Sequence, residues 1–102
     1  MARVDAEIEN EYEEELELEE PKLYKVLLLN DDYTSMDFVV TVLVEIFHQN
    51  AQKANAIMYK IHEEGSGLCG VYTYEIAETK VAQVHMLAKE HGFPLRATME
   101  EE

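Results

Sequence analysis

The sequence predicts an α+β domain, a small β-α-α-β-α-β sandwich with three helices packed on a three-stranded antiparallel sheet. Its 102 residues allow one domain with one modest core. Three short apolar runs have the composition of strands, and three longer segments carry apolar side chains at helical spacing. Elements in this order bury their apolar faces by stacking helices on the sheet.

The first strand and the first helix are separated by a polar turn. Leu23–Leu29 is almost continuously apolar, which predicts a largely buried strand, and Asn30-Asp31-Asp32 predicts a turn after it. Thr34 and Asp37 then form a capping pattern, so we expect a helix that continues to about Gln49. Its apolar side would consist of Met36, Val39, Val40, Leu43 and Phe47.

The second helix follows a break near Asn50 and ends at the glycines of Gly65-Ser66-Gly67. Between these limits, apolar residues recur at helical spacing, namely Ala54, Ile57, Met58 and Ile61.

The remaining segments predict a strand, a third helix and a last strand. Leu68–Tyr74 is aromatic and β-branched, with Gly70 as a candidate for a bulge or a close approach. A helix over Glu75–His91 would end before Gly92 and Pro94, and Leu95–Met99 would form the last strand. The core side of this helix would consist of Ala77, Val81, Val84 and Ala88.

Charge and composition exclude several classes of protein. The formal net charge is −14, from 22 acidic and 8 basic residues, and such a field repels nucleic acid phosphates. No apolar run approaches the roughly 18 residues of a membrane span, and the N-terminus lacks the pattern of a signal peptide. The single cysteine, Cys69, cannot form an internal disulfide. We therefore expect a cytoplasmic protein that binds neither membranes nor nucleic acid.

Most of the negative charge lies in residues 1–20, which carry Asp5 and nine Glu against Arg3 alone. Repulsion between these carboxylates opposes collapse, so we expect a disordered acidic arm over residues 1–20 and a folded core over residues 21–102. The alternative is a frayed helix that uses Ile8, Tyr12, Leu16 and Leu18.

Catalytic and metal sites have little support. Cys69 lies in an apolar strand, where cysteine packs as a small hydrophobe, and no neighbouring cation would lower its pKa. Asn30, Asp32 and Thr34 imitate the first ligands of a calcium loop, but the required glycine and bidentate glutamate are absent. The four histidines form no metal-binding pair on one helix. We therefore expect no metal, no cofactor and no enzymatic activity.

The turn Asn30-Asp31-Asp32 and His62 form the cluster of greatest interest. In one interpretation the turn and a Thr34 cap are structural, and His62 only complements the end of its helix. In the other, Met58 and Ile61 line an apolar hollow that His62 borders. Met36 and Val39 would line the same hollow, and the acceptor groups of the turn at its rim would suit an ammonium group.

Four segments resemble the ClpS family, the N-degron adaptors of bacterial and plastid Clp proteases. The first is PKLYKVLLLNDDYTSMDFVV at residues 21–40, and the second is the spaced pattern Ala54, Ile57, Met58, His62 and Gly65. The others are CGVYTYEIAETK at residues 69–80 and Pro94-Leu95. The likeness spans the whole core. It departs from the family at Ser35, where proline is common, and at Ile61, which is often valine.

The resemblance implies an adaptor that binds a free N-terminal Leu, Phe, Tyr or Trp and delivers the substrate protein to a Clp unfoldase in the bacterial cytosol. The α-amino group would be bound by Asn30, Asp31, Asp32 and His62. The side chain would enter a pocket of Thr34, Met36, Val39, Met58, Ile61 and Leu95. Glu75 and Lys80 would contact the N-terminal domain of a ClpA-type or ClpC-type AAA+ unfoldase.

Two other classes of function stay open on the residues alone. An acidic interaction domain like those of ribosomal stalk proteins has a similar α+β build, but it gives no reason for the turn and His62 to occur together. A metal-assisted Asp/His hydrolase would need a ligand set that the motifs lack. No ATP-binding glycine loop is visible, so energy must come from the partner.

Overall fold

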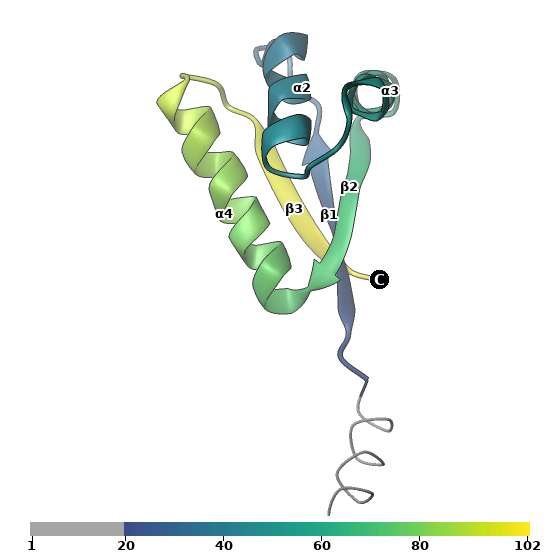
Figure 1. The fold of residues 1–102 in the computed structure, drawn as a ribbon. Coiled ribbons are helices and arrows are strands. Elements are labelled where there is room, and N and C mark those ends of the chain that lie inside the picture. Colours follow the sequence, from purple (N-terminus) through teal and green to yellow (C-terminus); the bar gives the residue numbers. More distant parts are fainter. Residues whose placement is uncertain (1–19) are drawn as a thin grey trace, which may run out of the picture.

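The computed structural model describes residues 20–102, so almost all of the expected acidic arm, residues 1–19, lies outside the described part of the chain. The described residues form a three-stranded antiparallel sheet and three helices in the predicted order (Figure 1). The elements are β1 (Leu23–Leu29), α2 (Met36–Glu45), α3 (Ala51–Glu64), β2 (Ser66–Thr73), α4 (Tyr74–Glu90) and β3 (Arg96–Glu101).

The sheet has the order β2-β1-β3, and its central strand explains the apolar run of the sequence. Val26 and Leu28 of β1 are fully buried beneath the helices, while the alternating residues Lys25, Leu27 and Leu29 face the other side and are partly exposed. Opposite Val26 and Leu27, β2 contributes Gly70 and Leu68, so Cys69 is an extra residue in a bulge. The bulge therefore lies one residue before the predicted Gly70. Gly70 itself is a point of close approach, because a Cβ there would overlap the Tyr72 ring.

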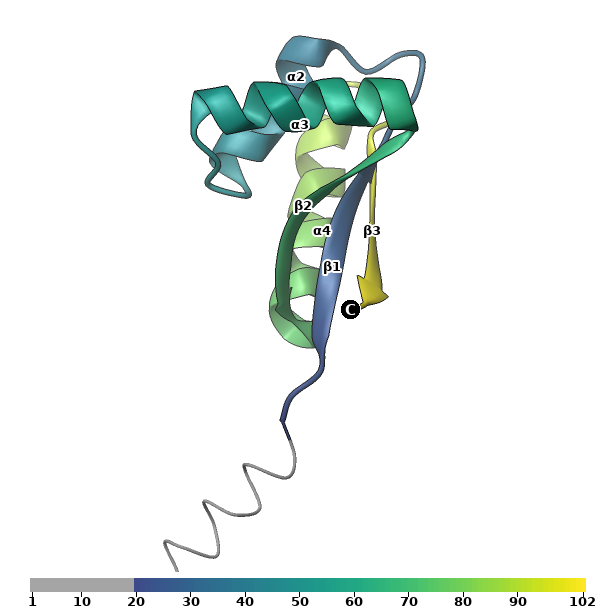
Figure 2. The same cartoon turned by 90° about the vertical axis from the view of Figure 1, so that its right-hand side faces the viewer.

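The helices cover the sheet in two ways. Helix α4 runs along one face, whereas α2 and α3 gather at the end of the sheet where β1 stops (Figures 1 and 2). All of the buried side chains of the described residues are apolar, and they form one cluster between these elements. The end of β1 and the end of α3 are thereby brought together, although they are distant in the sequence.

Helix α2 differs from the prediction at both ends. Its N-cap is Ser35, whose hydroxyl accepts a hydrogen bond from the Phe38 amide at 3.1 Å; the predicted Thr34 instead donates its hydroxyl to Asp31. The helix ends at Glu45 and not near Gln49. His48 has a left-handed backbone, with φ of 56°, which cannot continue an α-helix.

Strand β3 continues to Glu101, two residues beyond the predicted end at Met99. The acidic end of β3 lies beside basic residues at the start of β1. The ammonium of Lys22 is 3.6 Å from the Glu101 carboxylate, and that of Lys25 is 4.0 Å from the Glu100 carboxylate. These cross-strand pairs reduce the charge repulsion that the composition of the segment alone suggests.

Candidate functional site

The turn after β1 is ordered by one carboxylate. Asp31 accepts hydrogen bonds at Oδ1 from the Tyr33 and Thr34 amides, at 2.8 and 2.7 Å, and at Oδ2 from the Thr34 hydroxyl at 2.7 Å. Burial acts to raise the pKa of Asp31, but these hydrogen bonds outweigh it and hold the pKa below its ordinary value of 3.8. Asp31 is therefore ionised at neutral pH and holds the turn in one conformation.

A backbone hydrogen bond joins this turn to the end of α3. Gly65 ends α3 in a left-handed conformation, with φ of 92°, and its carbonyl accepts a hydrogen bond from the Asn30 amide at 2.8 Å. His62 lies in the last turn of the same helix. The sequence-distant turn and His62 consequently stand at the same place in the fold.

A cavity of about 220 Å³ lies between the turn, α2 and α3. Nine of the ten residues expected to bind an N-terminal residue line it, namely Asn30, Asp31, Asp32, Thr34, Met36, Val39, Met58, Ile61 and His62. Because α2 begins directly after the turn, Met36 and Val39 lie one helical turn apart on the side of α2 that lines the cavity. Met58, Ile61 and His62 occupy the matching positions of α3. The structure thus forms the hollow described by the second interpretation of the cluster.

The cavity is apolar in its interior and has an adaptable side chain at its mouth. Val39, Met58 and Ile61 are buried, whereas Met36 is 44% exposed. Ile61 is held from behind by β2, since a Cβ at Gly67 would lie only 2.6 Å from Ile61 Cγ1. A guest side chain would meet a fixed inner wall and, at the mouth, the flexible thioether of Met36.

The rim of the cavity is rich in hydrogen-bond acceptors and negative charge. Asn30, Asp32 and His62 are exposed, and among residues 20–102 the side chains of Asn30 and Asp32 have no hydrogen-bond partner. The rim also lies at the C-terminal end of α3, which carries the negative end of the helix dipole. This combination favours a cation with several N–H donors, such as an ammonium group.

Leu95 is the one expected pocket residue that the structure does not bring to this cavity. It is 3% exposed and lines a different hollow beside α4, together with residues such as His85 and Phe93. It immediately precedes β3, whose first residue Arg96 pairs with Leu29, and it is buried in the shared core.

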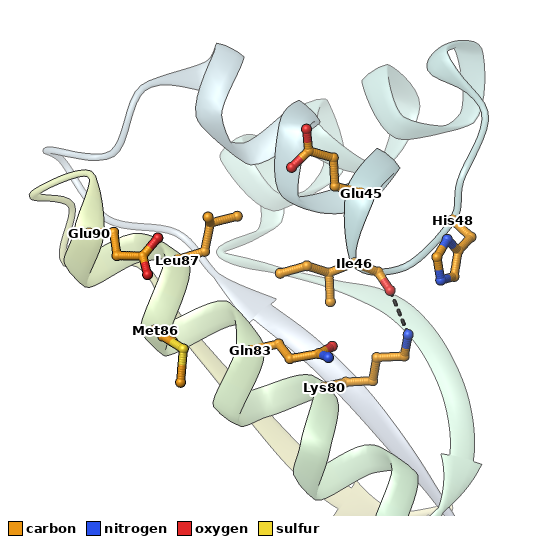
Figure 3. Close-up of a pocket in the computed structure, with 8 residues that line it drawn as sticks. All are labelled: Glu45, Ile46, His48, Lys80, Gln83, Met86, Leu87 and Glu90. Atoms are coloured by element: carbon orange, nitrogen blue, oxygen red, sulfur yellow. Dashed lines mark hydrogen bonds between the residues drawn. The ribbon is translucent and has the colours of Figure 1, made fainter.

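The two residues expected at a partner interface lie on α4 and differ in their surroundings. Glu75 is exposed in the first helical turn. Lys80 is partly buried, and its ammonium donates a hydrogen bond at 2.6 Å to the Ile46 carbonyl at the C-terminus of α2 (Figure 3). The same ammonium lies 5.8 Å from the centre of the Tyr72 ring. Five positions apart, the two residues do not share one helical face.

A shallow groove of about 380 Å³ adjoins Lys80, between α4 and the segment that follows α2 (Figure 3). Its lining is mixed, with Glu45, Ile46, His48, Lys80, Gln83, Met86, Leu87 and Glu90. The sequence did not predict this groove. It lies beside the segment that follows α2, and the early end of α2 depends on tertiary contacts. The bond between Asn30 and Gly65 was also not predicted, although the glycine that ends α3 was a usable signal.

Cys69 packs as a small hydrophobe, as predicted. Its side chain is 2% exposed, and burial raises the pKa of the thiol to about 12, despite an opposing backbone hydrogen bond. The thiol is therefore protonated at neutral pH and is a poor nucleophile. Residues 20–102 contain no cluster of side chains suited to a metal ion, and no helix among them is long and apolar enough to cross a membrane.

Comparison with known proteins gives a consistent result. A family profile described as "ATP-dependent Clp protease adaptor protein ClpS" matches residues 19–98. The ClpS adapter protein of Wolinella succinogenes is 52% identical over 101 residues, covering 99% of both chains. That of Oleidesulfovibrio alaskensis is 61% identical over 87 residues, covering 85% of this chain and 84% of the relative.

Among solved structures, Agrobacterium tumefaciens ClpS2 bound to L-phenylalaninamide matches with a TM-score of 0.78 and 46% sequence identity. The match covers 80% of this chain and 99% of that protein.

Proposed function

The chain belongs to the ClpS family of Clp protease adaptors, and from this membership we propose that it binds the free N-terminal Leu, Phe, Tyr or Trp of substrate proteins and delivers them to an AAA+ Clp unfoldase and its protease. The observation that carries the proposal is the cavity between the turn after β1, α2 and α3, with acceptor groups at its rim and an apolar interior. Such a site takes a ligand that is cationic at one end and apolar at the other.

The α-amino group is the feature that separates a first residue from an internal one. We assign its binding to Asn30, Asp32 and His62, with Asp31 beside them in the turn. An internal peptide nitrogen has one donor and no charge, so it would leave these acceptors without their partners. That mismatch excludes internal hydrophobic residues, which the apolar interior alone would accept.

The apolar interior would receive the first side chain. Burying a Leu or Phe side chain contributes about 1.5–3 kcal/mol, which is a useful but unspecific part of the affinity. The ligand of the Agrobacterium tumefaciens relative supports this assignment. L-Phenylalaninamide has a free α-amino group, a benzyl side chain and an amide in place of the carboxylate, so it resembles the first residue of a peptide.

The protein would act by binding alone. Its family consists of adaptors of a protease, so bond cleavage and energy belong to the partner. We assign the docking of the partner, the N-terminal domain of a ClpA-type or ClpC-type unfoldase, to the part of α4 that includes Glu75 and Lys80. The family match favours this function over the alternative of a ribosomal-stalk-like interaction domain.

The test is fluorescence anisotropy with labelled peptides that start with Leu, Phe, Tyr, Trp, Val or Met, each with a free and an acetylated N-terminus. We expect the free Leu and aromatic peptides to bind and their acetylated forms not to bind. His62→Ala should weaken binding at least about tenfold, because the charged ammonium of the peptide would lose one hydrogen-bond partner. His48→Asn is the matched control, because His48 is exposed outside the cavity and asparagine tolerates its left-handed backbone.

The opposite result is equally clear. If the folded protein binds none of the free peptides, or binds the acetylated peptides equally well, recognition of a free N-terminus is ruled out.

A further inference from the structure

The two aspartates of the turn after β1 differ in how their carboxylates are used. Asp31 is partly buried and accepts all three of its hydrogen bonds within the turn, from Tyr33 and Thr34. Asp32 is exposed, and no group within residues 20–102 donates a hydrogen bond to it. Both line the same cavity, so exposure to the cavity does not distinguish them.

Counting acceptor sites separates their roles. A carboxylate has about four lone-pair sites, and the turn occupies three of those on Asp31. An ammonium group bound to Asp31 could use only the one remaining acceptor site, or it would displace a hydrogen bond that orders the turn. Asp32 keeps all of its acceptor sites available.

The position of Asp31 gives its hydrogen bonds a consequence at the rim. Asn30 precedes Asp31, and its backbone N–H donates a hydrogen bond to the Gly65 carbonyl. Asp32 follows Asp31. With the segment from Tyr33 to Thr34 held by Asp31, both ends of the turn are fixed. The directions available to the Asn30 and Asp32 side chains are thereby restricted before a ligand arrives.

We infer that Asp31 is a positioning residue: its carboxylate folds the turn that carries Asn30 and Asp32, and it does not itself bind the substrate ammonium. The inference rests on the proposed function and refines it. The two adjacent aspartates have the same side chain, line the same cavity and belong to the same turn, but they contribute to recognition in different ways.

The test uses substitutions that separate shape from charge. Asparagine at position 31 keeps the turn, because its carbonyl oxygen accepts from the two amides and its NH₂ donates to the Thr34 hydroxyl. Alanine at position 31 keeps neither interaction. The comparison variants are Asp32→Asn and Asp37→Asn, the latter an exposed acidic residue of α2 that does not line the cavity.

Each full-length variant would be titrated with L-phenylalaninamide and with 3-phenylpropanamide, which lacks the α-amino group. The ratio of the two dissociation constants measures the preference for the amine, which a loss of stability alone does not change. We expect Asp31→Asn to reduce this preference no more than Asp37→Asn, within about threefold, and Asp31→Ala and Asp32→Asn to reduce it about tenfold or more.

Two results would overturn the inference. If Asp31→Asn loses as much preference as Asp32→Asn, the Asp31 charge contacts the ligand directly. If folded Asp31→Ala binds like the wild type, the turn does not depend on this carboxylate. A wild-type protein without any preference for the amine would instead refute the proposed function, so the two failures are distinguishable.

Discussion

Thr34 and Ser35 divide two roles that the sequence analysis gave to Thr34 alone. The capping pattern predicted Thr34 as the cap of the helix, and the family resemblance placed it in the pocket. Ser35 caps α2, and Thr34 is free to donate its hydroxyl to Asp31 while its side chain lines the cavity. Proline, common in the family at the position of Ser35, would suit the start of a helix but could not accept the hydrogen bond from Phe38. The serine therefore adds a side-chain cap next to the cavity.

Cys69 should react slowly with iodoacetamide in the folded protein and rapidly in denaturant. Its thiol is buried in the bulge of β2, and its pKa of about 12 leaves almost no thiolate at about pH 8, a little below the ordinary cysteine pKa. Mass spectrometry of alkylated protein against time would measure the rate. Rapid alkylation of the folded protein, at the rate seen in denaturant, would contradict the burial.

The raised pKa of Cys69 makes the free energy of unfolding depend on pH. Because the pKa of Cys69 is raised on folding, its contribution to stability is complete below the unfolded pKa and is lost as the pH rises from there toward about 12. Cys69→Ala removes this dependence as well as some packing.

Helix α2 depends on a neighbouring element for its C-terminal end. Without an αL glycine after Glu45, the last carbonyls need other partners, and the Lys80 ammonium reaches one of them, that of Ile46, from α4. The positive charge also complements the negative end of the helix dipole. The position of α2, which carries Met36 and Val39 of the cavity, is thereby coupled to α4.

Lys80→Met should reduce the free energy of unfolding by about 1.5–3 kcal/mol, the range for a hydrogen bond to a charged group, since methionine keeps much of the apolar stem but not the donor. Lys80→Arg is the control because it keeps a donor and a positive charge. Urea unfolding measured by circular dichroism gives both values. Equal stability of Lys80→Met and the wild type would show that the bond contributes nothing.

The elements show what could be predicted from sequence and what could not. The ends of α3 were predictable because Asn50 and Gly65 act locally, through a side-chain cap and a left-handed backbone. The end of α2 was predicted too late, because contacts with other elements determine it. Gly70, the candidate for a bulge or a close approach, is the close approach, and the bulge lies at the adjacent Cys69. Nine of the expected residues line the cavity. Thr34 and Leu95 rested on family likeness alone; Thr34 lines the cavity, whereas Leu95 lines a different hollow.

Across the whole molecule, the proposed ligand and partner surfaces are separate. The cavity lies at the end of the sheet between α2 and α3, while Glu75 lies in the first turn of α4, toward the opposite end of the sheet (Figure 1). The proposed function needs this separation, because the adaptor would hold its substrate while it is bound to the unfoldase.

Glu75→Lys should therefore weaken binding to the N-terminal domain of the partner unfoldase by about tenfold or more, since it replaces a charge with its opposite at the proposed interface. Affinity for a peptide that starts with Phe should stay within about twofold, since surface substitutions away from a site have small effects. Glu90→Lys, an exposed change at the other end of the same helix, controls for net charge. Unchanged binding to the unfoldase domain would place the interface elsewhere.

The hydrogen bond between Asn30 and Gly65 shows that the cavity depends on closure of a long loop of the chain. The turn and the histidine come from opposite ends of a long stretch of polypeptide, and closing such a loop costs entropy before any contact is gained. Without α3 the cavity would lack Met58, Ile61 and His62, and the turn alone would not form it. The cavity is therefore complete only when the chain from Asn30 to Gly65 has closed on itself.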